Sequence, residues 1–281
     1  AEMGVRLDRN KIPSVFYKGR MADEWMLPYT IWDKSDYSAS AMGTNLLTSL
    51  IGAKKFDYPK SLYAVIDCLR VLSSNRDATF LDFFAGSGTT GHAVLELNKN
   101  DEGNRKFILC TNNEINGQEK SLREQGLSED EIQAHGICQS VTYPRIKRVI
   151  DGYENVDGIS ANLKYYKTIF VHANPTDKNK IALTRKATEM LCVKEDTFDK
   201  VKSTEKYLIF RNKNRYTGII YDHQAIDDFK NEIANVDGKF NVYVFSLGDD
   251  TFEDEFGDLT SKVKLSPIPE AILRVYRRIF K

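Results

Sequence analysis

The chain has no excess of charge of either sign. Its 281 residues include 40 lysines and arginines against 40 aspartates and glutamates, and its isoelectric point is about 7.1. A compact module that binds nucleic acid by itself is usually basic. The balance therefore argues against strong DNA binding by this chain alone, although local basic patches stay open.

Cysteine and histidine are also scarce. The four cysteines, Cys68, Cys110, Cys138 and Cys192, have no CxxC spacing, and the four histidines are equally scattered. This pattern is typical of reduced thiols in the cytosol rather than of a disulfide framework or a zinc site. We expect a cytoplasmic protein without a bound metal.

Long hydrophobic runs are missing as well. No apolar stretch approaches the ~20 residues of a membrane span, and no signal peptide opens the chain. The first residue is Ala1 rather than methionine, which fits a processed chain or a fragment. With 41% hydrophobic and 28% charged residues, the composition predicts a globular protein of two domains with no membrane partner.

The clearest pattern lies in residues 78–97. Residues 79–84 are an apolar run rich in strand-forming side chains, a glycine-rich turn follows at 86–91, and aliphatic residues then recur at helical spacing. The order predicts strand, turn and helix. A glycine turn at a helix N-terminus allows the backbone to approach a ligand closely.

Two ligand classes use this arrangement, and Asp82 helps to separate them. The spacing of Gly86, Gly88 and Gly91 permits a dinucleotide, with Glu114 at roughly the ribose-binding distance of about 20 residues. However, a carboxylate at the end of the strand would repel a pyrophosphate. It would attract a ligand with an ammonium and a sulfonium, and S-adenosylmethionine carries both. The alternative is that Asp82 only ties down the turn through backbone N–H groups.

A nine-residue run resembles the S-adenosylmethionine-binding motif of amino-group DNA methyltransferases. The run is Asp82, Phe83, Phe84, Ala85, Gly86, Ser87, Gly88, Thr89 and Thr90. It is most similar to the modification (Mod) subunits of type III restriction systems, which are adenine-N6 methyltransferases. The resemblance implies an α/β fold with a Rossmann-like core that binds S-adenosylmethionine through these nine residues, and Glu114 as a ligand of the ribose hydroxyls. A solvated loop acid is the alternative for Glu114.

Segments on both sides extend the resemblance. Residues 43–45 and 56–61 are similar to the family's segment that closes over the methionine end of the cofactor. The resemblance implies cofactor contacts from Asn45, Pro59 and Lys60, and a solvated lysine is the alternative for Lys60.

Downstream, residues 107–114 are similar to the family's second strand, and residues 141–148 are similar to a segment shortly after it. Residues 107–111 are expected to form a buried parallel strand. The charged residues 117–136 between them predict a helical insert with a capping box of Ser128 and Glu131.

A helix is expected to begin near Pro59. Pro59 is expected in its first turn, with Lys60 beside it. The helix has an apolar stripe of Leu62, Val65, Ile66, Leu69 and Leu72.

Three cations lie close together farther along the chain, and these are Arg145, Lys147 and Arg148. They either face phosphates or form a solvated helix face.

The chain is expected to divide into three regions. Residues 1–42 are predicted to be the tail of a target-recognition or connector region, and residues 43–160 the cofactor-binding part of the methyltransferase core. Residues 161–281 are predicted to be a small α/β domain for assembly or partner contacts. In this domain we expect a strand at 163–171, and a terminal helix opening at Pro269.

The other elements predicted in the last region are local. They are a helix at 181–191, a hairpin of 207–211 and 216–221, a helix around 226–233 and a strand at 240–247.

An Asp-Pro-Pro-Tyr-type motif, which holds the acceptor amine in the resembling family, is missing. We therefore assign no catalytic residue. The sequence predicts the cofactor-binding part of a site-specific adenine-N6 DNA methyltransferase, inactive alone, which meets DNA through the full-length protein. A homodimer and a restriction subunit are the expected partners. The alternatives are a cofactor-binding or assembly module without catalysis, and a nucleotide-binding dehydrogenase domain.

Overall fold

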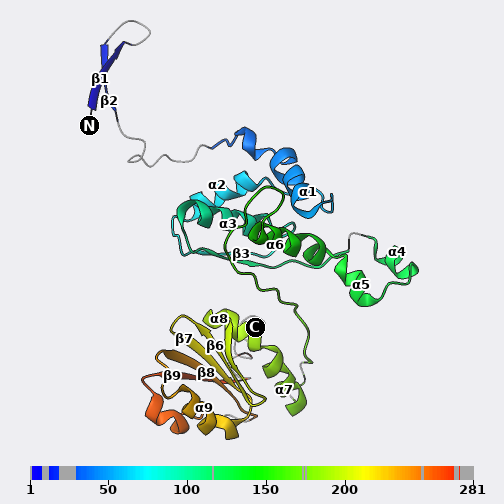
Figure 1. Ribbon diagram of the computed structural model, residues 1–281, viewed down its shortest axis with the longest axis vertical. Helices are drawn as coiled ribbons and strands as arrows, with labels where there is room; N and C mark the ends of the chain where they lie inside the picture. Colours follow the sequence, from blue (N-terminus) through cyan, green and yellow to red (C-terminus); the bar gives the residue numbers. More distant parts are fainter. Residues whose placement is uncertain are drawn as a thin grey trace. The chain divides into compact units, whose positions relative to one another are not determined.

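The structure is a computed structural model that describes residues 2–7, 13–18, 30–115, 117–172, 174, 176–247, 250–268 and 272. The chain splits into two compact units, Ala1–Tyr166 and Lys167–Lys281. Both units combine helices and strands, so the fold is mixed α/β (Figure 1).

The first unit begins with a hairpin of β1 (Glu2–Leu7) and β2 (Pro13–Lys18), which pair antiparallel. Its main part contains a strand, a helix and a second strand in sequence. These are β3 (Thr79–Asp82), α3 (Thr89–Asp101) and β4 (Lys106–Leu109), and the two strands pair in parallel. This is the predicted order of strand, turn, helix and strand, although β3 ends at Asp82 rather than at residue 84.

Three more helices complete the core of this unit. They are α1 (Leu46–Ile51), α2 (Leu62–Leu72) and α6 (Tyr143–Asp151). The apolar stripe of α2 packs on α3, where Leu62, Ile66 and Leu69 meet Ala93, Val94 and Leu97. A second cluster joins α1, α3 and α6 through Leu50, Leu95, Ile146, Val149 and Ile159.

The start of α2 differs from the prediction. Ser61 is the N-cap, and its hydroxyl oxygen accepts a hydrogen bond from the backbone N–H of Ala64. Pro59 and Lys60 therefore precede the helix instead of forming its first turn, because serine satisfies a free N–H group of the first turn that neither of them can satisfy. Leu72, the last member of the predicted stripe, is exposed.

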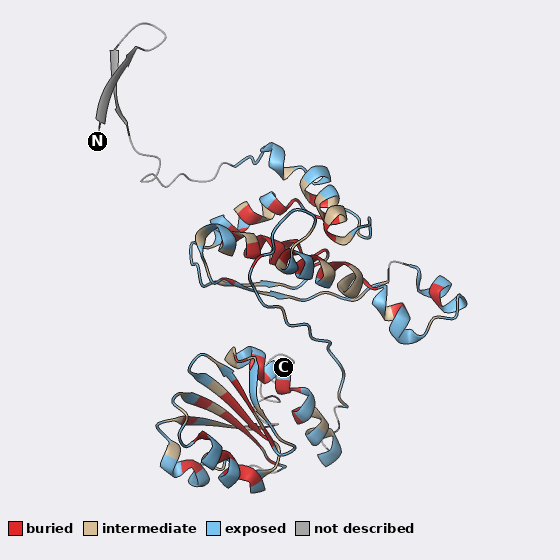
Figure 2. Ribbon diagram, viewed as in Figure 1, coloured by how far each residue is buried: buried red, intermediate tan, exposed pale blue. Residues whose placement is uncertain are grey.

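Among the described residues, the β3–β4 pair is covered on one face only. Exposed and half-buried residues alternate along both strands, and none of them is fully buried (Figure 2). Phe80 and Phe107 pack against the helices, whereas Leu81 is 51% and Ile108 is 40% exposed. The prediction of a fully buried strand at 107–111 is therefore wrong. Side chains alternate between the faces of a strand, and in the described residues helices cover only one of these faces.

A charged insert follows β4. It contains α4 (Glu119–Glu124) and α5 (Glu129–Ala134). The predicted capping box is confirmed, since the Ser128 side chain accepts from the Glu131 N–H, and the Glu131 carboxylate accepts from the Ser128 N–H at 2.8 Å. A 3-10 helix, η1 (Ser35–Tyr37), and two π-helical segments, η2 (Ser40–Asn45) and η3 (Cys138–Thr142), also flank the helices.

The second unit contains a five-stranded sheet in the order β5-β6-β7-β8-β9. The strands are β5 (Asp199–Ser203), β6 (Tyr207–Asn212), β7 (Arg215–Ile220), β8 (Lys239–Phe245) and β9 (Val263–Ile268). The first three are antiparallel neighbours, and β7, β8 and β9 are parallel. The predicted hairpin and the strand near 240 are thereby confirmed.

Helices cover both faces of this sheet. They are α7 (Asp177–Lys186), α8 (Thr188–Glu195) and α9 (Ile226–Ile233), with short turns η4 (His223–Ala225) and η5 (Asp254–Leu259). One core forms around Phe229 of α9 and Phe256 of η5. The other forms around Leu191 of α8 and Tyr243 of β8. Because each face has its own core, the sheet is a middle layer.

The predicted strand at 163–171 is wrong. In the described part of the chain this segment belongs to no strand, and Ile169 and Phe170 are exposed. A strand needs a partner for its backbone groups, and β-propensity alone does not provide one. The terminal helix predicted from Pro269 lies outside the described residues. Among the helices that are described, none has the length and apolar character needed to cross a membrane.

Candidate functional site

The turn after β3 is shaped by three glycines. Gly86 and Gly88 have positive φ angles of 48° and 78°. A Cβ on Gly88 would lie 3.2 Å from Cγ2 of Thr142, and a Cβ on Gly91 would lie 2.9 Å from the Cδ1 atoms of Ile146 and Leu109. The glycines therefore serve both the left-handed backbone and the close packing of the turn and α3 against η3, α6 and β4.

A pocket of about 250 Å³ opens beside this turn. Its lining residues come from the turn, from the segment before α2 and from α2 itself. They are Phe56, Asp57, Tyr58, Lys60, Val65, Asp82, Phe84, Ala85, Gly86, Ser87, Thr89 and Thr90. Small-molecule sites usually measure roughly 300–1,000 Å³, so the described residues form a site at or below the lower limit of that range.

Asp82 is bonded within the turn. Its Oδ1 accepts the backbone N–H of Phe84 at 3.0 Å, and its Oδ2 accepts the Thr90 hydroxyl at 2.6 Å. Asp82 therefore does stabilise the turn through hydrogen bonds, as the alternative interpretation of this residue predicted. Each carboxylate oxygen can accept a second hydrogen bond, so these contacts leave Asp82 able to face a cationic ligand from the pocket wall.

Eight of the predicted cofactor residues line the pocket. They are Lys60, Asp82, Phe84, Ala85, Gly86, Ser87, Thr89 and Thr90. The others lie outside the lining, and these are Asn45, Pro59, Phe83, Gly88 and Glu114. Pro59 is buried behind the wall, where a Cβ on Gly43 would overlap its carbonyl oxygen.

Glu114 is exposed in the loop after β4. Its carboxylate accepts Nδ2–H of Asn112 at 3.4 Å, and its backbone carbonyl accepts the N–H of Ile137 at 2.9 Å. The structure thus places Glu114 on the loop that follows the second parallel strand, but not in the wall of the pocket.

Four lining residues were not among the predicted site residues. Phe56, Asp57 and Tyr58 belong to the segment whose resemblance was noted, and Val65 belongs to the apolar stripe of α2. Tyr58 has a positive φ of 56° and is 88% exposed. The resemblance of residues 56–61 to the family could have indicated the first three. The position of Val65 in an apolar stripe indicated only a core residue.

The burial of Arg145 shows that both predictions for this residue, a phosphate contact and a place on a solvated helix face, are wrong. Its exposed fraction is 0%, so it neither faces phosphates nor lies on a solvated helix face. Its NH1 group donates to the Thr89 hydroxyl at 2.8 Å, to the Ser87 hydroxyl at 3.2 Å and to the Ser87 carbonyl at 3.4 Å. Lys147 and Arg148 on the same helix are exposed. The available signal was spacing, because Arg145 lies four residues before the buried Val149.

Arg145 also contacts a buried histidine. Its NH2 group lies 3.4 Å from Nδ1 of His92, and Nε2 of His92 lies 3.6 Å from Oε1 of Glu96. Because a guanidinium only donates, Nδ1 must accept and the ring proton belongs on Nε2. Burial, together with the Arg145 charge, lowers the pKa of His92. The hydrogen bond from His92 lowers the pKa of Glu96, and burial lowers the pKa of Arg145 to about 10.

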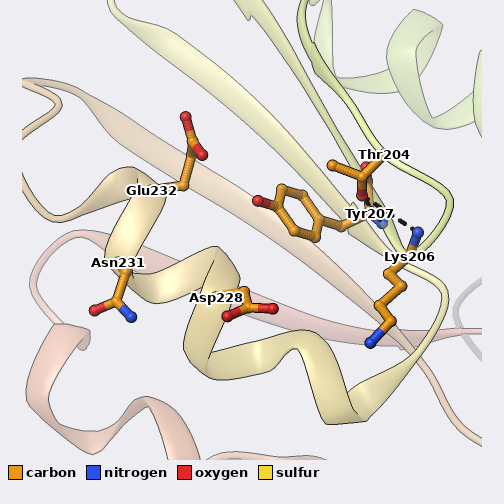
Figure 3. A pocket seen from close by; sticks show the side chains of 6 residues that line it. All are labelled: Thr204, Lys206, Tyr207, Asp228, Asn231 and Glu232. Carbon is orange, nitrogen blue, oxygen red and sulfur yellow. Dashed lines mark hydrogen bonds between the residues drawn. The ribbon is translucent and has the colours of Figure 1, made fainter.

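A second hollow, of about 630 Å³, lies in the second unit (Figure 3). Its lining residues are Thr204, Lys206, Tyr207, Asp228, Asn231 and Glu232. Thr204 already accepts the N–H groups of Lys206 and Tyr207, and Glu232 pairs with Lys202 at 2.7 Å. These contacts hold the hollow together, and we assign no chemistry to it. Within the described ranges, no group of three or more His, Cys, Asp or Glu is placed to hold a metal ion.

Residues 14–123 match the family model described as DNA methylase. We refer to these residues as the DNA methylase segment because of that similarity. Over 99 residues it is 40% identical to the type III restriction-modification enzyme EcoPI Mod subunit of Escherichia phage P1, covering 35% of this chain and 15% of that protein. The resemblance drawn from the sequence is thereby confirmed.

Two other relatives match parts of this chain. The type II methyltransferase M.KpnI of Klebsiella pneumoniae is 46% identical over 85 residues, which are 30% of this chain and 20% of that protein. The type III restriction-modification enzyme StyLTI Mod subunit of Salmonella typhimurium is 44% identical over 80 residues, which are 28% of this chain and 12% of that protein. The similarity thus spans no more than about a fifth of the length of any of these relatives.

Proposed function

We propose that this chain carries the cofactor-binding part of an adenine-N6 DNA methyltransferase, with a Rossmann-like core that binds S-adenosylmethionine. The observation that carries the proposal is the pocket beside the glycine turn, formed by the DNA methylase segment and walled by Asp82. In the complete protein, the cofactor supplies a methyl group for the exocyclic amine of adenine. The residues of this chain hold and orient that cofactor.

The pocket wall fits the chemistry of S-adenosylmethionine. This molecule carries an ammonium and a sulfonium, and the wall contains the carboxylates of Asp82 and Asp57. Gly86 leaves space at the turn, because a Cβ there would lie 3.2 Å from the ring of Phe56. The residues proposed to hold the cofactor are those of the nine-residue run, with Lys60, Asn45, Pro59 and Glu114 around it.

The same wall disfavours a dinucleotide. The carboxylates of Asp82 and Asp57 outnumber the one lysine of the lining, Lys60, so the wall would repel a pyrophosphate where a dinucleotide needs positive potential. The glycine spacing alone does not distinguish the two ligand classes, since both need a close approach of the backbone. We therefore prefer the methyltransferase over the dehydrogenase.

The acceptor half of the reaction is proposed to belong to the rest of a longer protein. None of the seven prolines is paired with another, and they are Pro13, Pro28, Pro59, Pro144, Pro175, Pro267 and Pro269. Positioning of the amine in line with the methyl group is worth roughly 7–11 kcal/mol of the barrier. The uncovered face of β3 and β4 and the small pocket volume are consistent with a site that other segments complete.

The proposed partners follow from the same interpretation. The full-length protein would bind DNA. Its protein partners would be a second copy of the same chain and a restriction subunit. We propose the second unit as the part that makes these contacts, because its sheet is covered on both faces and we assign no chemistry to the hollow described in it.

Isothermal calorimetry tests the proposal. The full chain should bind S-adenosylmethionine or its demethylated product and should not bind NAD. Asp82→Ala should weaken binding by about tenfold or more, since a charge-assisted contact is worth about 1.5–3 kcal/mol. Asp130→Ala, which changes an exposed acid on α5, is the matched control and should leave affinity unchanged. Equal binding by wild type and Asp82→Ala would refute the role of Asp82.

A further inference from the structure

Arg145 is a buried cation directly beneath the ligand turn. Its side chain is fully buried, its NH1 group contacts Ser87 and Thr89, and its Nε atom has no hydrogen-bond partner among the described residues. An arginine without full pairing is costly to bury. An apolar side chain of the same size would fill this position at a lower free-energy cost of burial. The charge of Arg145 therefore has a role other than packing.

The compensation of this charge is indirect. No carboxylate forms an ion pair with the guanidinium among the described residues, and the nearest acidic connection runs through His92 to Glu96. Neutral His92 accepts from Arg145 and turns its Nε2–H toward the Glu96 carboxylate. This arrangement leaves the side of the guanidinium that faces the turn positive, and only two hydroxyls and one carbonyl face it there.

The hydroxyl hydrogens of the turn can be counted. Ser87 and Thr89 have two hydroxyl hydrogens between them, and their oxygens are 3.1 Å apart. Arg145 donates to both oxygens, so neither hydroxyl can use its hydrogen on the guanidinium. One hydrogen bridges the pair. The other has no acceptor among the described residues, and both residues belong to the pocket lining although they are only 4% and 5% exposed.

We infer that Arg145 is a positioning residue that turns the Ser87–Thr89 hydroxyl pair into a hydrogen-bond donor for an anionic group in the pocket. This inference rests on the proposed function, and the anionic group of S-adenosylmethionine is its carboxylate. The buried charge polarises the pair toward donation, as cooperative hydrogen-bond chains do at low local dielectric.

The turn would then have two parts that favour ligand groups of opposite charge. The carboxylate of Asp82 favours the cations of the ligand, and the pair backed by Arg145 favours its anion. Thr90 and Thr89 are adjacent in the chain, and they contact Asp82 and Arg145 respectively. A zwitterionic amino-acid group matches this pattern better than a ligand with a single sign of charge.

The test compares two ligands that differ only in the anion. S-adenosylmethionine and its decarboxylated form are titrated into the full chain by calorimetry, well below its unfolding temperature. Wild type should prefer the carboxylate form by about tenfold, the worth of one charge-assisted hydrogen bond. Arg145→Met should lose this preference, with the affinity for decarboxylated ligand held within about twofold. Arg145→Lys, which keeps the charge without the fork, should keep part of it.

Two further variants complete the experiment, one as a control and one as an independent test. Arg148→Met alters an exposed cation on the same helix and should leave the preference intact. The double substitution Ser87→Ala with Thr89→Val removes both hydroxyls while Arg145 stays, and it should abolish the preference even if Arg145→Met fails to fold.

Each outcome bears on a different claim. Equal weakening of both ligands by folded Arg145→Met, or an unchanged preference in the double variant, would overturn the inference and leave cofactor binding standing. Failure of wild type to bind either ligand would overturn the proposed function and this inference with it.

Discussion

The hydroxyl of Thr142 donates a 2.6 Å hydrogen bond to the backbone carbonyl of Gly86, 56 residues earlier in the chain. The bond connects η3 to the middle of the ligand turn, and the methyl of Thr142 is the atom nearest to the missing Cβ of Gly88. One threonine therefore contacts two glycines of the turn. Segment 141–148, which resembled the family, supports the turn from behind through this residue and Arg145.

Thr142→Val should destabilise the chain by about 1–3 kcal/mol, because it leaves the Gly86 carbonyl without its donor inside the protein. Thr142→Ser keeps the hydroxyl and should cost less. Urea unfolding followed by circular dichroism measures both. A valine variant as stable as wild type would show that the bond does not hold the turn.

Gly88→Ala should be more destabilising than Gly126→Ala. Both glycines have a positive φ, 78° and 82°, so alanine pays about 1–2 kcal/mol of backbone strain at either position. Only at Gly88 does the new Cβ also meet Thr142 at 3.2 Å, whereas nothing lies within 4 Å at Gly126. Thermal unfolding of the two variants isolates the crowding, and equal losses would argue against it.

Stability should fall as the pH drops below neutral. The folded pKa of His92 is lowered from its ordinary 6.5, so the unfolded chain binds the proton more readily. The contribution of His92 is thus complete above about pH 6.5 and is lost as the pH falls from there toward the folded pKa. The lowered pKa of Glu96 acts in the same direction below its ordinary 4.5.

His92→Gln should flatten this dependence between about pH 7 and pH 5, since an amide does not titrate there. Urea midpoints at several pH values measure the slope. A His92→Gln variant with the wild-type slope would contradict the assignment.

Limited proteolysis should separate the two units. The sequence predicted a boundary between residues 160 and 161, and the structure divides the chain between Tyr166 and Lys167. Trypsin should cut first at Lys164 or Lys167, which are exposed and outside helices and strands. A folded piece from about residue 168 onward should remain. Loss of both halves together would indicate one continuous core.

The chain alone should not methylate DNA. A radiolabelled methyl-transfer assay on unmodified genomic DNA measures this directly. Strong incorporation by residues 1–281 would show that an acceptor site without paired prolines is present here. The expected failure has to be read beside a positive binding experiment, because a chain that binds no cofactor would fail for a different reason.

Local signals in the sequence predicted the elements that local chemistry determines. The capping box of Ser128 and Glu131 and the hairpin around Lys213 were correct, because a cap and a tight turn depend on neighbouring residues. The strand expected at 163–171 was wrong, because pairing depends on residues far away in the chain.

The candidate site shows the same limit. The nine-residue run marked most of the pocket wall, but the role of Arg145 could not be predicted from its charge. Arginine is usually exposed, and only the packing of α6 against the turn buries it. Val65 was predicted as a core residue, and its contact with the pocket depends on where α2 lies beside the turn.

One face of β3 and β4 is left uncovered by the residues that the structure describes, and this has a consequence for handling the protein. Leu81 and Ile108 present apolar surface on a short parallel pair, and surfaces of this kind adhere to one another when nothing shields them. At millimolar concentrations the isolated chain will associate through this face and scatter light, and mild non-ionic detergent will reverse the turbidity. Replacing Leu81 and Ile108 together with threonine would raise its solubility while the glycine turn keeps its shape.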